Sequence, residues 1–242
     1  MAHIDDAEKA HLERIERELS PRPDGLGRRA FLGTAAATAA TLASPDLLAK
    51  PQKNLAASPP PDFSPFSAPG RVVKVTKKDC LQANQLYPKE DAAKDMLTKA
   101  LTELTGKPDL VSAVGEFVHK DDIVCVKVNG IALRNMGTNK ELVLPFLEAM
   151  IAAGVKPENI TVLEQYGGFL AGTRVSAQNV PAGVKIAVHG NGNATMDDRM
   201  IPGTGVRTKF VRYLTEATCA INFALIKDHS ICGYPGALKN MT

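Results

Sequence analysis

Tryptophan is absent from this chain of 242 residues, and aromatic residues make up only 5% of it. So few rings argue against a surface on which the bases of a single-stranded nucleic acid would stack. The 29 basic residues nearly balance the 26 acidic ones, and a net charge of +3 gives no electrostatic basis for binding a polyanion. The composition therefore predicts no nucleic-acid partner.

Cysteine is also scarce: there are four, and no two of them form a C-x-x-C pair. This spacing fits neither a zinc ribbon nor an iron–sulfur cluster bound within the chain, and the cofactor stays unknown. Cys125 and Cys219 lie in apolar runs, where a buried thiol is a poor nucleophile. Cys232 lies in a loop and is the candidate reactive thiol; a Cys80–Cys232 disulfide after export is an alternative.

Long hydrophobic runs are missing as well. The ten residues 34–43 are all alanine or threonine except for one leucine. A membrane-spanning helix needs roughly 20 apolar residues. The sequence therefore predicts no stable membrane span. Directly before this segment, Arg28-Arg29-Ala30-Phe31-Leu32 resembles the R-R-x-F-L pattern of twin-arginine export signals.

This resemblance implies a signal peptide over residues 1–43, the twin-arginine export machinery as a partner, and a periplasmic or extracellular location. The alternative is an arginine pair on a surface helix rich in alanine. Residues 44–70 follow as a predicted linker, because residues 58–70 contain five prolines. The folded domain is expected over residues 71–242.

Within that domain, apolar runs typical of strands alternate with stretches of helical periodicity. Helices are expected over 92–104, ended by Gly106, over 109–118, and over 142–153 behind a Thr138-x-x-Glu141 capping box, with a kink or a later start at Pro145. Strands are expected over 72–75, 123–128, 160–163, 184–188 and 220–226. This alternation predicts an α/β fold, a single mostly parallel sheet with helices on both faces.

Polar residues concentrate where the predicted strands end. In a parallel sheet these ends share one edge, where ligands of open α/β sheets bind. Lys127 and Lys227 each end an apolar strand, where a cation is costly unless it meets an anion or reaches solvent.

The candidate site therefore has Lys127, Asn129, Lys239 and Asn240 as ligand-binding residues, with His229 and Lys227 as catalytic residues. Lysines bind carboxylates or phosphates, and a histidine exchanges protons near neutral pH.

A metal site is the alternative use of the same loops. Its candidate ligands lack the H-x-x-x-H spacing of helix-borne zinc sites, so no metal is predicted. These candidates are Glu164, His189, Asp197, Asp198 and His229.

Several of these segments resemble the domain-of-unknown-function 362 family. The residues that carry the resemblance are Val126-Lys127-Val128-Asn129, Gly137-Thr138-Asn139, Ala153-Gly154-Val155, Ile221 to His229 with Gly233, and Ala237-Leu238-Lys239-Asn240. The resemblance covers the chain from about Arg71 onward, and it departs from the family pattern at Tyr234-Pro235, where members have a threonine.

The family resemblance implies a conserved polar site and a prokaryotic setting, without a settled reaction. Many members carry ferredoxin-like cysteine runs, which this chain lacks, so a separate ferredoxin-type partner is implied for any redox role.

We expect an exported protein that binds a small anionic molecule. In one version of this hypothesis the protein is a redox or metal-linked enzyme. A non-catalytic solute-binding or accessory protein is the alternative, and a structural envelope protein is a third. Because the chain stops just after Lys239-Asn240, we expect further residues to complete the sheet and the site; the alternative is a short C-terminal helix that ends the domain.

Overall fold

The protein is described from a computed structural model, which covers residues 57–190, 195–200, 204–228, 233–234 and 236–241. The predicted signal peptide, His229 and Cys232 lie outside these residues. The described part of the proline-rich segment, residues 57–70, forms neither helix nor strand. It nevertheless lies against the domain, because the ring of Phe66 packs edge-on against Phe117 at a centroid distance of 5.6 Å.

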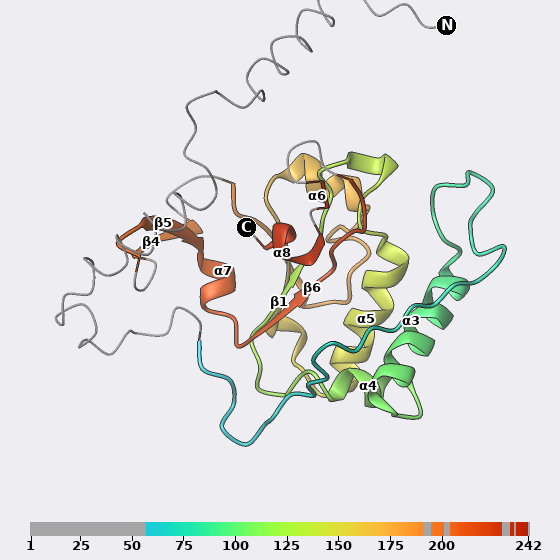
Figure 1. Cartoon of the computed structure of the whole chain (residues 1–242), viewed down its shortest axis with the longest axis horizontal. Helices are drawn as coiled ribbons and strands as arrows, with labels where there is room; N and C mark the ends of the chain where they lie inside the picture. The colour runs from blue at the N-terminus through green and yellow to red at the C-terminus, as the bar shows by residue number, and fades with distance from the viewer. Residues whose placement is uncertain (1–56, 191–194, 201–203, 229–232, 235, 242) are drawn as a thin grey trace, which may run out of the picture. The chain divides into compact units, whose positions relative to one another are not determined.

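Four parallel strands form the sheet, in the order β3-β2-β1-β6. This confirms the α/β prediction. The chain passes outward from β1 to β2 and β3, and then returns to place β6 on the other side of β1 (Figure 1). The order of the strands therefore reverses between β1 and β6, and such a reversal is where open α/β sheets bind ligands. The strands are β1 Val124–Lys127, β2 Ile160–Glu164, β3 Lys185–Val188 and β6 Cys219–Asn222.

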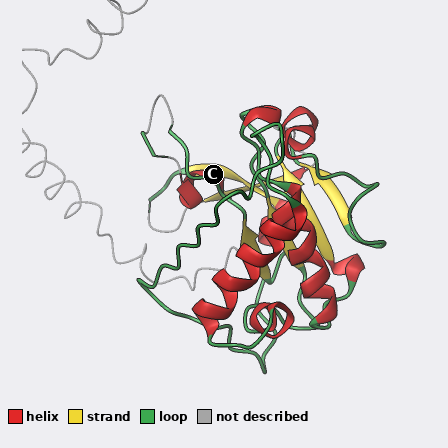
Figure 2. Ribbon diagram, turned by 90° about the vertical axis from the view of Figure 1, so that its right-hand side faces the viewer, coloured by secondary structure: helices red, strands yellow, loops and turns green. Residues whose placement is uncertain are grey.

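Three helices, α3 (Glu90–Thr105), α4 (Leu110–Gly115) and α5 (Lys140–Ala152), pack against one another on one face of the sheet (Figure 2). Their apolar side chains meet those of β1 and β2 in the main core. The core residues with the least exposure include Val114, Val124, Val126, Val143, Leu147, Met150, Ile160 and Val162.

The ends of these helices follow from local chemistry. Gly106 stops α3 because it takes a left-handed φ of 77°, from which its N–H reaches the Thr102 carbonyl. The Asp109 side chain caps α4 by accepting a hydrogen bond from the Ser112 N–H.

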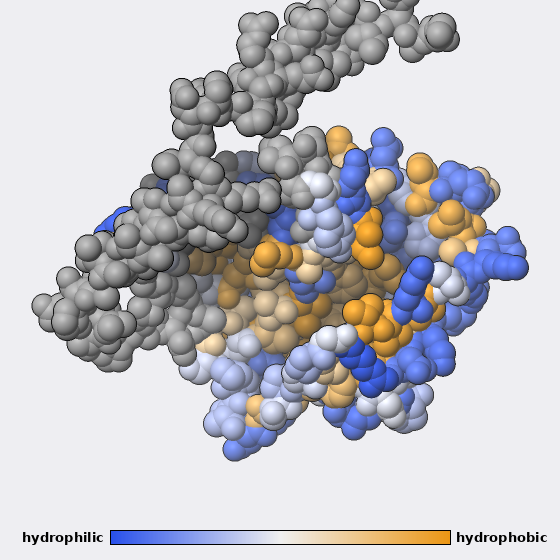
Figure 3. Space-filling view, viewed as in Figure 1, coloured by the Kyte–Doolittle hydropathy of each residue, from blue (hydrophilic) through white to orange (hydrophobic). Residues whose placement is uncertain are grey.

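The opposite face of the sheet is covered in part by the short helix α7 (Arg212–Thr215). There Cys125 and Leu163 form a second, smaller cluster with Ala217. Apolar surface also shows in the centre of the space-filling view, between hydrophilic side chains at its rim (Figure 3). A separate antiparallel pair, β4 (Met196–Met200) and β5 (Arg207–Val211), lies between β3 and α7 in the chain.

Two expected strands differ from the structure. Residues 72–75 form no strand, because no neighbouring strand takes up their backbone groups; Val72 is 87% exposed. The last parallel strand ends at Asn222 and does not continue to Ile226, which is 90% exposed and has no core to bury it.

The predicted capping box is wrong. Asn139 is the N-cap residue of α5, and it makes no side-chain cap hydrogen bond. Glu141 instead forms a bidentate ion pair with Arg174, in which two N–O distances are 2.7 and 2.6 Å. Pro145 lies inside α5, and the helix starts at Lys140, so the start is not shifted beyond the proline.

None of the helices in the described ranges combines the length and the hydrophobicity that crossing a bilayer requires.

Candidate functional site

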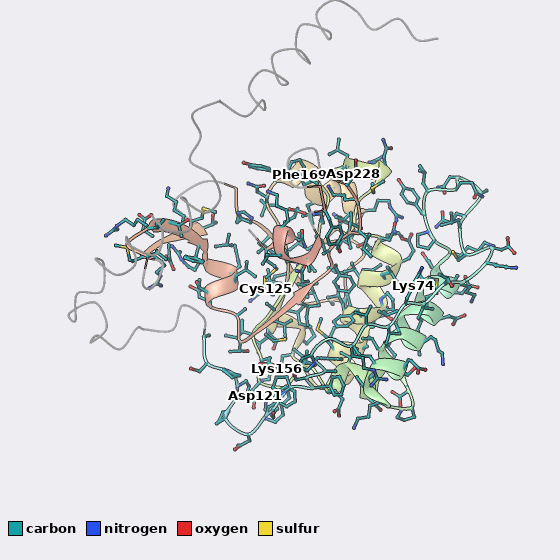
Figure 4. All side chains as sticks on the ribbon, in the orientation of Figure 1. Lys74, Asp121, Cys125, Lys156, Phe169 and Asp228 are labelled. Atoms are coloured by element: carbon teal, nitrogen blue, oxygen red, sulfur yellow. The ribbon has the colours of Figure 1, made fainter. Side chains whose placement is uncertain are left out.

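The two edges of the parallel sheet carry different residues (Figure 4). Asp121 and Lys156, which precede β1 and β2, lie at one edge, and Phe169 and Asp228, which follow β2 and β6, lie at the other. Cys125, inside β1, lies between them. The loops that were predicted to form the site therefore gather at the carboxyl edge.

A cavity of about 110 Å³ opens at this edge. Its walls come from the ends of β1 and β2, the loops after β3 and β6, and the helices α6 (Gly167–Thr173) and α8 (Gly236–Asn240). The lining residues are Lys127, Asn129, Ile131, Glu164, Gln165, Phe169, His189, Lys227, Lys239 and Asn240.

Five of the six residues predicted for the site line this cavity: Lys127, Asn129, Lys227, Lys239 and Asn240. The sixth, His229, lies outside the described residues. Helix α8 brings the last two predicted residues to the strand ends, although they are more than one hundred positions from β1 in the chain.

The structure also brings in residues that were not predicted to bind the ligand. The sequence indicates Glu164 and His189 only as candidate metal ligands, and it does not indicate Gln165 or Phe169 as site residues. Glu164 ends β2, and Gln165 and His189 directly follow β2 and β3, so their places at strand ends are a signal in the sequence; Phe169 lies within α6 and has no such signal. Asp197 and Asp198 lie on β4 and do not line the cavity; within the described part of the chain, no three metal-binding side chains gather at one point.

Lys127 and Glu164 form a buried ion pair at the base of the site. Lys127 Nζ lies 3.0 Å from Glu164 Oε1, and the two side chains are 8% and 5% exposed. Lys127 Nζ also donates to the Val128 carbonyl at 2.7 Å and to Asn240 Oδ1 at 3.4 Å. The charge of Lys127 is therefore already balanced within the protein, which the sequence did not indicate.

Glu164 also joins the loops that follow β1 and β2. Its Oε2 accepts a hydrogen bond from the Gly130 N–H at 2.9 Å, and its Oε1 accepts one from the Gln165 N–H at 2.6 Å. Each carboxylate oxygen is therefore hydrogen-bonded, as a buried charge requires. Glu164 fixes the shape of the cavity as well as its charge.

Three asparagines connect β1, β6 and α8 around the cavity. Asn129 Nδ2 donates to Asn240 Oδ1 at 2.9 Å, and Asn240 Nδ2 donates to Asn222 Oδ1 at 2.8 Å. Asn222 Nδ2 in turn donates to the Ala237 carbonyl in α8 at 2.7 Å. Asn129 Oδ1 is buried and has no hydrogen-bond partner among the described residues.

Thr138 holds the loop after β1 in place. Its Oγ1 accepts from the Asn129 N–H at 2.8 Å and donates to the Phe223 carbonyl beyond β6 at 2.9 Å. The hydroxyl thereby links the two strands between which the order of the sheet reverses. This contact replaces the helix cap that the sequence predicted for Thr138.

Gly130 allows the wall formed by α6 to approach β1. A Cβ atom at this position would lie 1.7 Å from the Phe169 carbonyl oxygen, a backbone atom that cannot move aside as a side chain would. Gly130 is therefore required by close packing of two backbone segments. The approach places Phe169 at the cavity and brings the Gly130 N–H to Glu164.

His189 is the first residue after β3. Its backbone N–H donates to the Glu164 carbonyl at 3.1 Å, and its ring Nδ1 lies 2.7 Å from the Gly190 carbonyl. Burial, assisted by the charge of Lys127, lowers the pKa of the ring, while the Gly190 carbonyl and Glu164 oppose this shift. The ring is therefore favoured in its neutral form near neutral pH.

The two cysteines in the sheet are poor candidates for chemistry. Burial raises the pKa of Cys125 to about 12 and that of Cys219 to about 11. Both thiols therefore remain protonated near neutral pH and lack nucleophilic character. Neither residue lines the cavity.

The charge balance of the cavity favours a small anion. Among the described residues that line it, three are lysines and one is a glutamate, and the ring of His189 is favoured in its neutral form. Lys227 is half-buried and Lys239 is exposed, and these two residues can reach a ligand while Lys127 remains paired. The volume is well below the roughly 300–1,000 Å³ of pockets for drug-sized ligands.

Comparison with known proteins gives no match at the level of a family model, a curated protein or a solved structure.

Proposed function

We propose that this protein binds a small anionic molecule in the cavity at the carboxyl edge of its sheet. The observation that carries the proposal is that three of the described residues lining this small cavity are lysines and only one is acidic, at the point where the strand order reverses. Lys227 and Lys239 supply the attraction, because Lys127 is neutralised by Glu164. Asn129 and Asn240 hold the loops that surround the ligand.

A catalytic form of this function is the second candidate. It is supported by His189, a neutral imidazole among the lysines of the cavity, which could take a proton from a bound ligand. We retain Lys227 and His229 as proposed catalytic residues. A non-catalytic solute-binding or accessory protein uses the same lysines without turnover and requires neither histidine.

We further propose export by the twin-arginine route, membership of the domain-of-unknown-function 362 family, and a separate ferredoxin-type partner for any redox reaction. The support lies in the Arg28-Arg29-Ala30-Phe31-Leu32 segment and in the lysine and asparagine motifs of the cavity.

Anion binding should stabilise the folded protein. A ligand at one hundred times its dissociation constant adds about 2.7 kcal/mol to the free energy of unfolding, and roughly 2–4 °C of Tm accompanies each kcal/mol in a domain of this size. Thermal unfolding of the full chain in inorganic phosphate, compared with sodium chloride of equal ionic strength, should therefore show a higher Tm.

Phosphate also stabilises proteins without a specific site, by exclusion from their surface. The Lys227→Ala variant should lose the specific part of the increase, whereas Lys185→Ala should keep it, because Lys185 is exposed at the amino end of β3. An equal increase in all three proteins would rule out the proposed site.

Replacing Arg28 and Arg29 by lysine should block export, since the twin-arginine pathway recognises the arginine pair. The measurement is the fraction of full-length protein found outside the cytoplasm of a bacterium that has this pathway. Lys9→Arg, a change of cation outside the motif, serves as the control. Undiminished export of the double-lysine variant would contradict the proposal.

A further inference from the structure

The ring of His189 has a defined hydrogen-bonding direction. Its Nδ1 lies 2.7 Å from the Gly190 carbonyl oxygen, which can only accept a hydrogen bond, so Nδ1 carries a proton. In the neutral ring, Nε2 then carries a lone pair and acts as an acceptor.

The charged groups around the cavity favour this neutral ring. Lys127 from β1, Lys227 from the segment after β6 and Lys239 from α8 line the same cavity as His189, and Glu164 from β2 is the opposing charge. Glu164 is already paired with Lys127. A positive charge on the imidazole would therefore lie near these lysines in a partly buried place.

A second acceptor belongs to Asn129. Its amide nitrogen donates to Asn240, which leaves Asn129 Oδ1 buried and without a partner among the described residues. Because this oxygen is buried, His189 Nε2 is the acceptor through which a ligand in the cavity would be recognised.

We infer that this cavity selects anions that themselves carry a hydrogen-bond donor, with the neutral His189 ring accepting the ligand's proton through Nε2. Hydrogen phosphate, a phosphate monoester that retains a proton, and a hydroxycarboxylate share this chemistry. An anion of the same shape without a donor would place an oxygen lone pair against the lone pair of Nε2. The inference rests on the proposed anion binding and specifies the class of ligand.

Two pairs of ions test it with the full chain. Hydrogen phosphate and sulfate have nearly the same shape, and above neutral pH both are dianions, but only the first carries a proton. Glycolate and acetate make the corresponding comparison for carboxylates. Calorimetric titration should show binding of the donor-bearing ion to be roughly tenfold tighter, the difference expected when a polar group is left unpaired. If tighter binding of the donor-bearing ion is found only for hydrogen phosphate over sulfate, the ligand is a phosphate. If it is found only for glycolate over acetate, the ligand is a hydroxycarboxylate. Either result supports the inference.

The variant His189→Ala should bind hydrogen phosphate and sulfate equally, whereas His119→Ala, which changes a histidine that does not line the cavity, should keep the wild-type preference. Equal affinity for both ions in the wild-type protein would overturn the inference while leaving anion binding intact. A preference that survives in His189→Ala would also overturn it. If no ion of either pair binds, the proposed function itself fails.

Discussion

The variant Glu164→Gln is expected to lose about 3–5 kcal/mol of unfolding free energy, because breaking a buried ion pair leaves an uncompensated charge. Lys127, which is 8% exposed, would remain in place with only neutral partners. Glutamine has nearly the shape of glutamate, so the loss reports on charge and hydrogen bonding and not on packing. Denaturant unfolding of the full chain measures it.

The ion pair Lys77–Asp95 provides the matched control, because its Nζ–Oδ2 distance is 2.7 Å but its side chains are 41% and 67% exposed. Asp95→Asn should leave the free energy of unfolding nearly unchanged, since exposed pairs contribute little. Similar losses of unfolding free energy for Glu164→Gln and Asp95→Asn would contradict a stabilising role of the buried Lys127–Glu164 pair.

The parallel sheet could be predicted because its central strands are almost continuously apolar. Residues 123–128 and 160–163 have no polar side that would face solvent, so only a strand covered on both faces buries them. β4 and β5 carry mixed polar residues and gave no such signal. β4 and β5 form an antiparallel pair with each other. Such a pairing depends on tertiary structure and cannot be predicted from the residue pattern of either strand alone.

The sequence predicts that the site lies at the carboxyl ends of the parallel strands. The chain direction of parallel strands fixes that Lys127, Lys227 and Asn240 come to one place, provided the strands themselves are recognised. The direction of the strands does not determine which of the lysines in the site is neutralised by Glu164. That depends on the register that sets β1 beside β2 and brings Lys127 Nζ to Glu164, a contact between residues 37 positions apart.

Thr138 illustrates the same limit. The local pattern Thr-x-x-Glu is typical of a helix cap, but both side chains find better partners elsewhere: Thr138 binds the Phe223 carbonyl and Glu141 binds Arg174. Tertiary contacts overrode a local preference that is worth about 1 kcal/mol.

Removing both ligand-facing lysines should have the largest effect on binding. A hydrogen bond to a charged group contributes about 1.5–3 kcal/mol, so we expect Lys227→Ala combined with Lys239→Ala to weaken binding of hydrogen phosphate by at least about 100-fold. Lys127 is left unchanged in this variant because it belongs to the buried pair. The two replaced side chains are half-buried and exposed, so the fold should tolerate their loss.

The direct test of the anion site is therefore calorimetric titration of hydrogen phosphate into the full-length wild-type chain, into this double variant, and into a control that lacks Lys156 and Lys185. The control lysines are exposed and lie at the amino edge of the same sheet, so both variants lose two positive charges. We expect one saturable site in the wild type and in the control, and binding weakened by at least about 100-fold in the cavity variant. Equal affinity in the two variants, or no saturable binding by the wild type, would contradict the anion site.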